Sequence, residues 1–216
     1  MSYVCLLANR NGAVVAGDTR ETIENLFHWD HRRKIYKSAK GDVVWAMCGL
    51  TRYFMVDYFR KISHLLEHRV DDMSDIQIVR TIATLMAKGT LWQNRLDLKK
   101  RRSSITVFIC FDHSRGPAVY TVSAVNGRAS FRRMPVPCAL EGGSGTANVT
   151  RLDVRDIAFL SLPELYEAAV RQTQASIDED RRKKETQKKY LSTVGGRVLA
   201  EKMTYKINKQ IRNIQI

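Results

Sequence analysis

The sequence predicts an α+β fold in which two β-sheets pack together and helices flank them. Two predicted strands, Ser2 to Ala8 and Ala13 to Gly17, are apolar on both faces, so both faces must be covered. The predicted elements follow the order strands, two helices, strands, two helices and a final strand. Internal strands with external helices suit a pair of packed sheets.

The first half of the chain begins with strands and continues with two helices. Asn11-Gly12 marks a hairpin turn, and a second hairpin-like pair joins Lys34–Ser38 to Asp42–Cys48. Apolar residues then recur at helical spacing from Thr51 to about Arg69 and from Ser74 to about Lys99.

The second half returns to strand periodicity and ends with a long helix and a strand. Three strands are predicted at Ser104–Phe111, Ala118–Val125 and Arg128–Met134, with Asn126-Gly127 as a turn. A glycine-rich bend, Gly142 to Gly145, precedes a short helix. Ser161-Leu-Pro-Glu164 is a capping box that opens a helix to about Lys188, and a strand region follows from Tyr190 to Ile207.

Composition indicates one globular domain with a basic surplus. The 216 residues are 44% apolar, and neither a linker nor a repeat divides the range 1–216. The net charge is +14, and +5 of it lies within the C-terminal segment 189–216. Because the basic clusters lack interleaved aromatic residues, nucleic acid is not the expected partner.

We also expect a cytoplasmic protein with no membrane partner. The longest apolar stretch, Val43 to Leu50, is far shorter than the ~20 residues that span a bilayer, and no secretory signal follows Met1. The cysteines are far apart in apolar contexts, which favours buried thiols over a disulfide framework or a zinc ribbon. They are Cys5, Cys48, Cys110 and Cys138.

A candidate catalytic group lies at the start of the chain. Ser2 is small, so removal of Met1 is expected, which would leave a free α-amine beside the serine hydroxyl. An α-amine has a pKa of ~7.7–8.0 and can act as a general base near neutral pH. A nearby lysine would lower that pKa, and a carboxylate would hold the lysine in place. Lys34 and Asp18 can supply these roles.

The loop between the first two strands determines which face of the sheet carries Asp18. A two-residue loop at Asn11-Gly12 would place Asp18 on the face opposite to Ser2. A three-residue loop, Arg10-Asn11-Gly12, would place it diagonal to Ser2 on the same face, about 7–8 Å away. We therefore predict the three-residue loop.

The stretch from Ser2 through Asn11-Gly-Ala-Val-Val-Ala-Gly-Asp18-Thr-Arg20 to Lys34 resembles the start of proteasome β subunits and of the bacterial HslV peptidase. In those N-terminal-nucleophile hydrolases the catalytic Thr, Asp and Lys are separated by 16 and then 16 residues, as Ser2, Asp18 and Lys34 are here. The resemblance implies a four-layer αββα sandwich. It also implies an amide hydrolase that cleaves peptides or proteins without a cofactor.

The resemblance implies roles at other positions. Val43 to Gly49 is similar to the family strand whose glycine amide forms the oxyanion hole, which gives that role to Gly49. Gly143-Ser144-Gly145 is similar to the family's Gly-Ser-Gly, whose serine assists proton transfer; the alternative for Ser144 is a helix N-cap. The residues expected to line the substrate cleft are Thr19, Arg20, Met47 and Thr51.

Two departures from the family pattern keep other activities open. The family usually carries an aspartate before Ser-Gly-Gly after the last long helix, and Lys188 to Gly196 contains none. Serine also replaces threonine at the nucleophile position. One alternative is therefore an inactive subunit that only self-assembles. Another is a peptide transpeptidase, similar to archaeal connectase, in which an amine rather than water resolves the ester.

The resemblance also implies partners. Its members act as rings or larger homo-oligomers, so we expect self-association, with the two helices between residues 51 and 99 as candidate contacts. Any ATPase unfoldase would be a separate chain.

A rival function is zinc catalysis. His64-Leu-Leu-Glu67-His68 matches the H-x-x-E-H pattern of inverted zinc peptidases, with both histidines on one helical face. Such a site needs a further carboxylate from a neighbouring helix, whereas the candidates Asp71, Asp72 and Asp75 follow in a loop. Because amphipathic helices produce this short pattern by chance, no metal site is expected.

Overall fold

The computed structural model of the chain has a mixed α+β fold with two antiparallel sheets, as the sequence predicts. It describes residues 2–23, 27–49, 52–53, 56–68, 73–96, 104–113, 116–187, 190 and 192–205. The first sheet has the strand order β12-β1-β2-β13, and the second has the order β11-β10-β9-β6-β5.

The first sheet contains β1 (Val4–Asn9), β2 (Gly12–Asp18), β12 (Cys138–Gly142) and β13 (Val198–Met203). The second contains β5 (Ile35–Lys37), β6 (Val43–Gly49), β9 (Ser104–Phe111), β10 (Ala118–Val125) and β11 (Arg128–Met134). Two short ribbons pair β3 (Glu21–Ile23) with β4 (Phe27–Trp29) and β7 (Arg52–Tyr53) with β8 (Val56–Asp57). The helices are α1 (Tyr58–Glu67), α2 (Asp75–Leu96), the 3₁₀ helix η1 (Ser144–Asn148), α3 (Val154–Ile157) and α4 (Leu162–Thr186).

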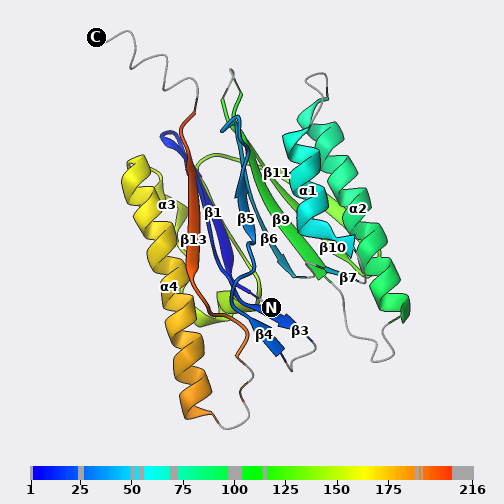
Figure 1. Cartoon of the computed structure of the whole chain (residues 1–216). Coiled ribbons are helices and arrows are strands. Elements are labelled where there is room, and N and C mark those ends of the chain that lie inside the picture. The colour runs from blue at the N-terminus through cyan, green and yellow to red at the C-terminus, as the bar shows by residue number, and fades with distance from the viewer. Residues whose placement is uncertain are drawn as a thin grey trace.

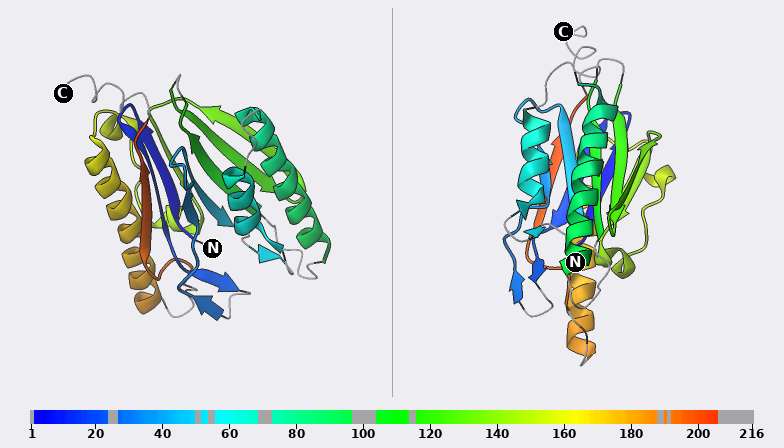
Figure 2. Two further views of the ribbon diagram at one scale, coloured as in Figure 1. Left: turned by 45° about the horizontal axis from the view of Figure 1, so that its top comes forward. Right: turned by 90° about the vertical axis from the view of Figure 1, so that its right-hand side faces the viewer.

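Three apolar clusters hold these elements together. One lies between the two sheets and includes Leu6, Val15 and Phe108. A second lies between the second sheet and the helices α1 and α2, and a third lies between the first sheet and α4. Figure 1 shows α4 outside the first sheet and α1 with α2 outside the second, and the left view of Figure 2 shows the same order. Every residue of β1 and β2 is buried, in agreement with their apolar sequences.

Several local predictions are confirmed. The bounds of β9, β10 and β11 match the predicted strands, and Asn126 and Gly127 both have positive φ, as a type I′ turn requires. The capping box at the start of α4 is present, with Ser161 and Glu164 bonded reciprocally. All four cysteines are free and buried.

Within the described ranges, no helix is long and apolar enough to cross a membrane.

The predicted three-residue hairpin loop is wrong. Asn9 pairs with Gly12, so the loop is Arg10-Asn11, and the Asn9 side chain accepts the Asn11 amide at 2.8 Å. Gly12 belongs to β2 rather than to the turn, and a Cβ there would lie 2.5 Å from the Met203 carbonyl oxygen. The glycine therefore serves close packing against β13, which the hairpin pattern could not reveal.

Other boundaries also differ from the sequence predictions. The first predicted helix begins at Tyr58 rather than Thr51, because the Asp57 side chain caps it and the ribbon of β7 and β8 precedes it. The described part of the last strand is Val198–Met203, shorter than the predicted region. β12 was not predicted, and it forms the edge strand beside β1.

Candidate active site

Ser2 lies two residues before the start of β1 and is buried, with 1% of its surface exposed. Its carbonyl oxygen accepts the Gly145 amide at 3.1 Å. Gly143 approaches so closely, with φ +96°, that a Cβ there would lie 1.9 Å from the same oxygen. The structure therefore brings the Gly143-Ser144-Gly145 bend against Ser2, although the two are far apart in sequence.

Asp18 and Lys34 form a buried ion pair close to the start of β1. Their Nζ–Oδ1 distance is 2.8 Å, and their side chains are 0% and 2% exposed. Oδ1 of Asp18 also accepts the Tyr3 amide at 2.8 Å, and Oδ2 accepts the amides of Arg20 and Gly195, each at 3.1 Å. Lys34 also donates to the Arg20 carbonyl oxygen. These bonds satisfy a charge pair that would otherwise be costly to bury.

The position of Asp18 follows from the end of β2 and not from the predicted register. The observed register sets Asp18 opposite Tyr3, and the Asp18 amide donates to the Tyr3 carbonyl oxygen at 3.1 Å. The carboxylate then accepts the Tyr3 amide, which is the peptide group next to Ser2. The pair is thus fixed directly to the backbone of the candidate nucleophile.

Burial changes the acidity of the lysine in this pair. Desolvation lowers the pKa of the Lys34 ammonium below its ordinary value, and the neighbouring Asp18 carboxylate opposes that shift. Cys48 lies in the same region, and burial raises the pKa of its thiol to about 12. Lys34 therefore releases a proton more readily than an exposed lysine, whereas Cys48 stays a neutral thiol.

The Gly49 amide points to the same side of β6 as Lys34. The Met47 amide donates to the Lys34 carbonyl oxygen at 2.8 Å, so it points toward β5. Amides in an antiparallel strand alternate between the two neighbours, so the Gly49 N–H points to the same side as that of Met47. Because β5 begins at Ile35, the Gly49 amide lies past the paired part of that strand.

Ser144 is not a helix N-cap. Gly143 occupies the cap position of η1 without a side-chain bond, and the Ser144 hydroxyl instead bonds the Thr193 hydroxyl at 2.9 Å. The Thr193 amide in turn donates to the Asp180 carboxylate, at 3.3 Å to Oδ1 and 3.2 Å to Oδ2. Thr193 thus contacts Ser144 through its hydroxyl and a buried carboxylate on α4 through its backbone amide.

Asp180 is a residue that the sequence reasoning missed. It is fully buried and also accepts the Ser192 hydroxyl at 2.6 Å and the Tyr190 hydroxyl at 2.8 Å. A signal for it existed, because Asp180 continues the buried stripe of α4 at helical spacing after Thr173 and Ile177. A carboxylate in that stripe requires internal partners.

Two of the predicted cleft residues use their side chains internally. The Thr19 hydroxyl donates to the Asp30 carbonyl oxygen at 2.7 Å and accepts the Arg197 amide at 2.8 Å. Arg20 forms a two-point ion pair with Asp30 and donates to the Ser192 hydroxyl at 2.6 Å. Their role as substrate contacts stays a prediction.

The other two cleft residues are placed differently. Met47 is fully buried in the cluster between the second sheet and the helices α1 and α2. Thr51 lies outside the described residues.

The residues of the zinc pattern lie on α1. The His64 and His68 rings are 4.1 Å apart at their centroids, and Glu67 accepts the Tyr36 hydroxyl and the Ala39 amide. Within the part of the chain that the structure describes, no three His, Cys, Asp or Glu side chains are grouped as a metal site would need.

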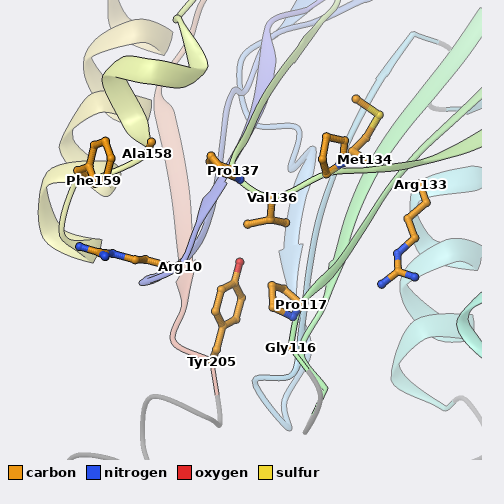
Figure 3. A pocket seen from close by; sticks show the side chains of 11 residues that line it. Arg10, Gly116, Pro117, Arg133, Met134, Val136, Pro137, Ala158, Phe159 and Tyr205 are labelled. Atoms are coloured by element: carbon orange, nitrogen blue, oxygen red, sulfur yellow. The ribbon is translucent and has the colours of Figure 1, made fainter.

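A large cavity lies away from these residues. It has a volume of about 950 Å³ and is shown in Figure 3. Its lining includes Arg10 and Phe159, with Tyr205 and Val136 facing the hollow. Arg10 is in the loop after β1, whereas Ser2 precedes that strand, so the strand's length of roughly 20 Å separates the cavity from the candidate site.

No protein-family model matches the chain, and no curated protein matches it. The function therefore has to be inferred from the site and from the resemblance of its residues to a known family.

Proposed function

We propose that the chain is an N-terminal-nucleophile amide hydrolase of the proteasome β-subunit and HslV type, acting on peptides or proteins. Its nucleophile is the Ser2 hydroxyl once the peptide bond before Ser2 has been cut. The observation that carries the proposal is the buried Asp18–Lys34 pair, whose carboxylate is bonded to the Tyr3 amide beside Ser2. A buried charge pair fixed to the backbone next to a hydroxyl is typical of catalytic sites.

The first half of the reaction forms an ester on Ser2. The Ser2 Oγ attacks the carbonyl carbon of the substrate amide, and its proton passes to the Ser2 α-amine. The Lys34 charge keeps the pKa of that amine low, and Asp18 holds Lys34 in position. The Gly49 N–H donates to the oxyanion that forms on the substrate carbonyl oxygen. The carbon–nitrogen bond then breaks, and the leaving amine takes the proton from the α-ammonium.

The second half of the reaction releases the acyl group. A water molecule gives a proton to the α-amine as it attacks the ester carbon. The ester bond breaks, the Ser2 oxygen recovers the proton, and a carboxylic acid leaves. Ser144 lies on the bend that contacts Ser2, and its bond to Thr193 can orient its hydroxyl toward this proton path.

The proposal includes the fold and the assembly of that family. The order of helices, sheet, sheet and helix supports a four-layer αββα sandwich of the N-terminal-nucleophile type. Self-association would use α1 and α2, where the α2 residues Ile76 and Trp92 are 47% and 54% exposed. Sedimentation of the protein and of a Trp92→Glu variant tests the assembly.

Peptide hydrolysis tests the activity. The full chain is incubated with a panel of fluorogenic peptides, alongside Ser2→Ala and Ser2→Thr variants. We expect Ser2→Ala to abolish turnover and Ser2→Thr to retain it, because threonine keeps a hydroxyl next to the α-amine. Equal turnover by the protein and the Ser2→Ala variant would overturn the proposal. Absence of turnover by a processed chain would support the inactive, self-assembling alternative instead.

A further inference from the structure

The inner face of the second sheet changes from apolar to polar toward the candidate site. Far from Ser2, this face carries Val44, Cys110 and Val119, which are buried between the sheets. Nearer to Ser2 it carries hydroxyl residues instead. The opposite face of the same strands stays apolar and buried against α1 and α2. The polar region is therefore a local feature of one face.

The hydroxyls form a row across the strands. The ladder registers set Cys48 opposite Thr106, Thr106 opposite Ser123, and Ser123 opposite Ser130. Directly paired residues project to the same face of a sheet, so all four share the inner face. Thr106 and Ser123 are half-buried and Ser130 is exposed, so this row becomes more accessible toward β11.

The row begins beside the bend that contacts the Ser2 backbone. A Cβ on Gly142 would lie 2.8 Å from Cys48 Sγ, and a Cβ on Gly143 would lie 3.5 Å from Cys48 Cβ and 1.9 Å from the Ser2 carbonyl oxygen. The end of β12 and its bend thus lie between Ser2 and the row. Because strands are ~4.8 Å apart, the three steps from Cys48 to Ser130 span roughly 15 Å, the length of about four or five extended residues.

Two arginines flank the outer end of the row. Arg132 is opposite Thr121 and Arg128 is opposite Val125, which places both on the inner face, on either side of Ser130. Both are exposed, and neither pairs with an acidic side chain within the described ranges. The strands β9, β10 and β11 contain no Asp or Glu. An accessible surface with free guanidinium groups is complementary to carboxylates.

We propose that this inner face of β9, β10 and β11 binds a segment of the peptide substrate that carries Asp or Glu side chains. The hydroxyls of Thr106 and Ser123, which lie 3.4 Å apart, and that of Ser130 bond the peptide backbone on the far side of the β12 bend from Ser2. Arg128 and Arg132 pair with carboxylates on that part of the peptide. The substrate class is thus an acidic peptide. This inference rests on the proposed function, because it makes the bound peptide a substrate of Ser2.

Peptide binding to the Ser2→Ala chain tests this surface without requiring turnover. The probes are two fluorescein-labelled twelve-residue peptides that differ only in four Glu residues replaced by Gln, and the readout is fluorescence anisotropy. The Glu peptide should bind more tightly, and its binding should weaken as salt concentration rises. Arg128→Gln and Arg132→Gln should each weaken the Glu peptide by about two- to fivefold and leave the Gln peptide unchanged.

Arg133→Gln is the matched control. Arg133 is the neighbour of Arg132, but it is paired with Tyr120 and projects to the opposite face. We expect it to leave both peptides unchanged. An equal loss from Arg133→Gln would overturn the proposal, because it would indicate a general charge effect. Equal affinities for the two peptides would also overturn it, as would no binding of the Glu peptide at about 1 mM.

Two further measurements separate this inference from the proposed function. Turnover of both peptides by the chain with Ser2 intact shows whether the site is active and whether it prefers Glu. Turnover without a preference for the Glu peptide would contradict only the proposal of an acidic-peptide surface. Binding that depends on Arg132 but occurs without turnover would contradict only the proposed hydrolase.

Sedimentation of Arg132→Gln tests whether this face joins copies of the chain. A changed oligomeric state with unchanged peptide binding would overturn the proposed peptide surface and assign the face to contacts between copies.

Discussion

The two ends of the layer between the sheets differ in their buried polar groups and in their open space. At the Ser2 end, Asp18 and Lys34 are almost completely buried and are bonded to each other and to the backbone. At the other end, the cavity of about 950 Å³ is open space beside prolines, Val136 and the exposed Phe159 ring. Asp42 and Asp112 are also buried toward that end, so the contrast is between a buried ion pair of opposite charges at the Ser2 end and an open cavity at the other.

A cavity does not by itself mark a catalytic site, because catalytic groups are recognised by shifted pKa values and by their charge partners. Burial shifts a pKa only when the titratable group itself is removed from water, as Lys34 is. Arg10, at the cavity, has its guanidinium 5.7 Å from the centre of the exposed Phe159 ring. The cavity end also contains a buried titratable group, because desolvation raises the pKa of the Tyr205 phenol that lines the cavity. The Ser2 end instead contains a buried ion pair of opposite charges.

The largest expected effect comes from removing one partner of the buried pair. Lys34→Met leaves the Asp18 carboxylate buried without its cation, so we expect a loss of about 3–5 kcal/mol in the free energy of unfolding. Turnover should fall by about 100-fold or more. Denaturant unfolding measures the first effect.

Two further variants serve as controls for Lys34→Met. Lys37→Met, three residues further along the chain and half-buried, should cost far less stability. Adding Asp18→Asn to Lys34→Met should recover part of the loss, because it removes the uncompensated charge. A loss below about 1 kcal/mol for Lys34→Met would mean that the pair is not essential to this end of the fold.

A smaller effect is expected at the carboxylate on α4. Asp180→Asn keeps the side-chain shape but loses one of the two oxygens that accept from Ser192, Thr193 and Tyr190, so we expect a loss of about 1–3 kcal/mol. Asp178→Asn, on the exposed face of the same helix, should change stability by less than about 0.5 kcal/mol. Thermal unfolding compares the two, and equal midpoints would contradict an anchoring role for Asp180.

The buried lysine also predicts a pH dependence. Because its folded-state pKa lies below the ordinary value of 10.5, the unfolded chain binds more protons between those two pKa values. Stability contributed by Lys34 therefore rises with pH across that window. The difference in free energy of unfolding between the protein and Lys34→Met should grow as pH increases toward 10.5.

The difference in free energy of unfolding between the protein and Lys34→Met excludes contributions that both proteins share. One of these is the contribution of Tyr190, because burial raises the pKa of its phenol to about 12. A difference that shrinks across the same pH range would contradict the lowered pKa of Lys34.

The smallest effect is expected at the opposite end. Phe159 is 77% exposed, so Phe159→Ala should change the free energy of unfolding by less than about 0.5 kcal/mol and leave peptide turnover unchanged. A large fall in turnover would show that the two ends are coupled and would remove the contrast between them.

The elements that could be predicted from sequence are those that local patterns determine. The strand bounds of β9 to β11 follow from periodicity and from the Asn126-Gly127 turn, and the start of α4 follows from its capping box. The β1–β2 register could not be predicted, because Gly12 is required by the approach of Met203 rather than by the turn. Local pattern carries no information about such a contact.

The candidate site, like the fold, could be predicted only in part. The spacing of Ser2, Asp18 and Lys34 selected groups that the fold places around the start of β1. The roles of Asp180 and Thr193 could not be predicted from the sequence, because they depend on how the chain after α4 folds back toward η1. The hydroxyl row could not be predicted either, because it arises only when the three separate strands β9, β10 and β11 pair in the observed register.

The most direct test of the central claim is the mass and position of a covalent label on residue 2. An epoxyketone offers two electrophilic carbons, which suit a hydroxyl and a free amine on one residue. After incubation of the full chain, intact mass and peptide mapping should show one reagent molecule on a chain that begins at Ser2, and no reagent on Ser2→Ala. A chain that keeps residues before Ser2, or labelling that persists in Ser2→Ala, would contradict Ser2 as the nucleophile.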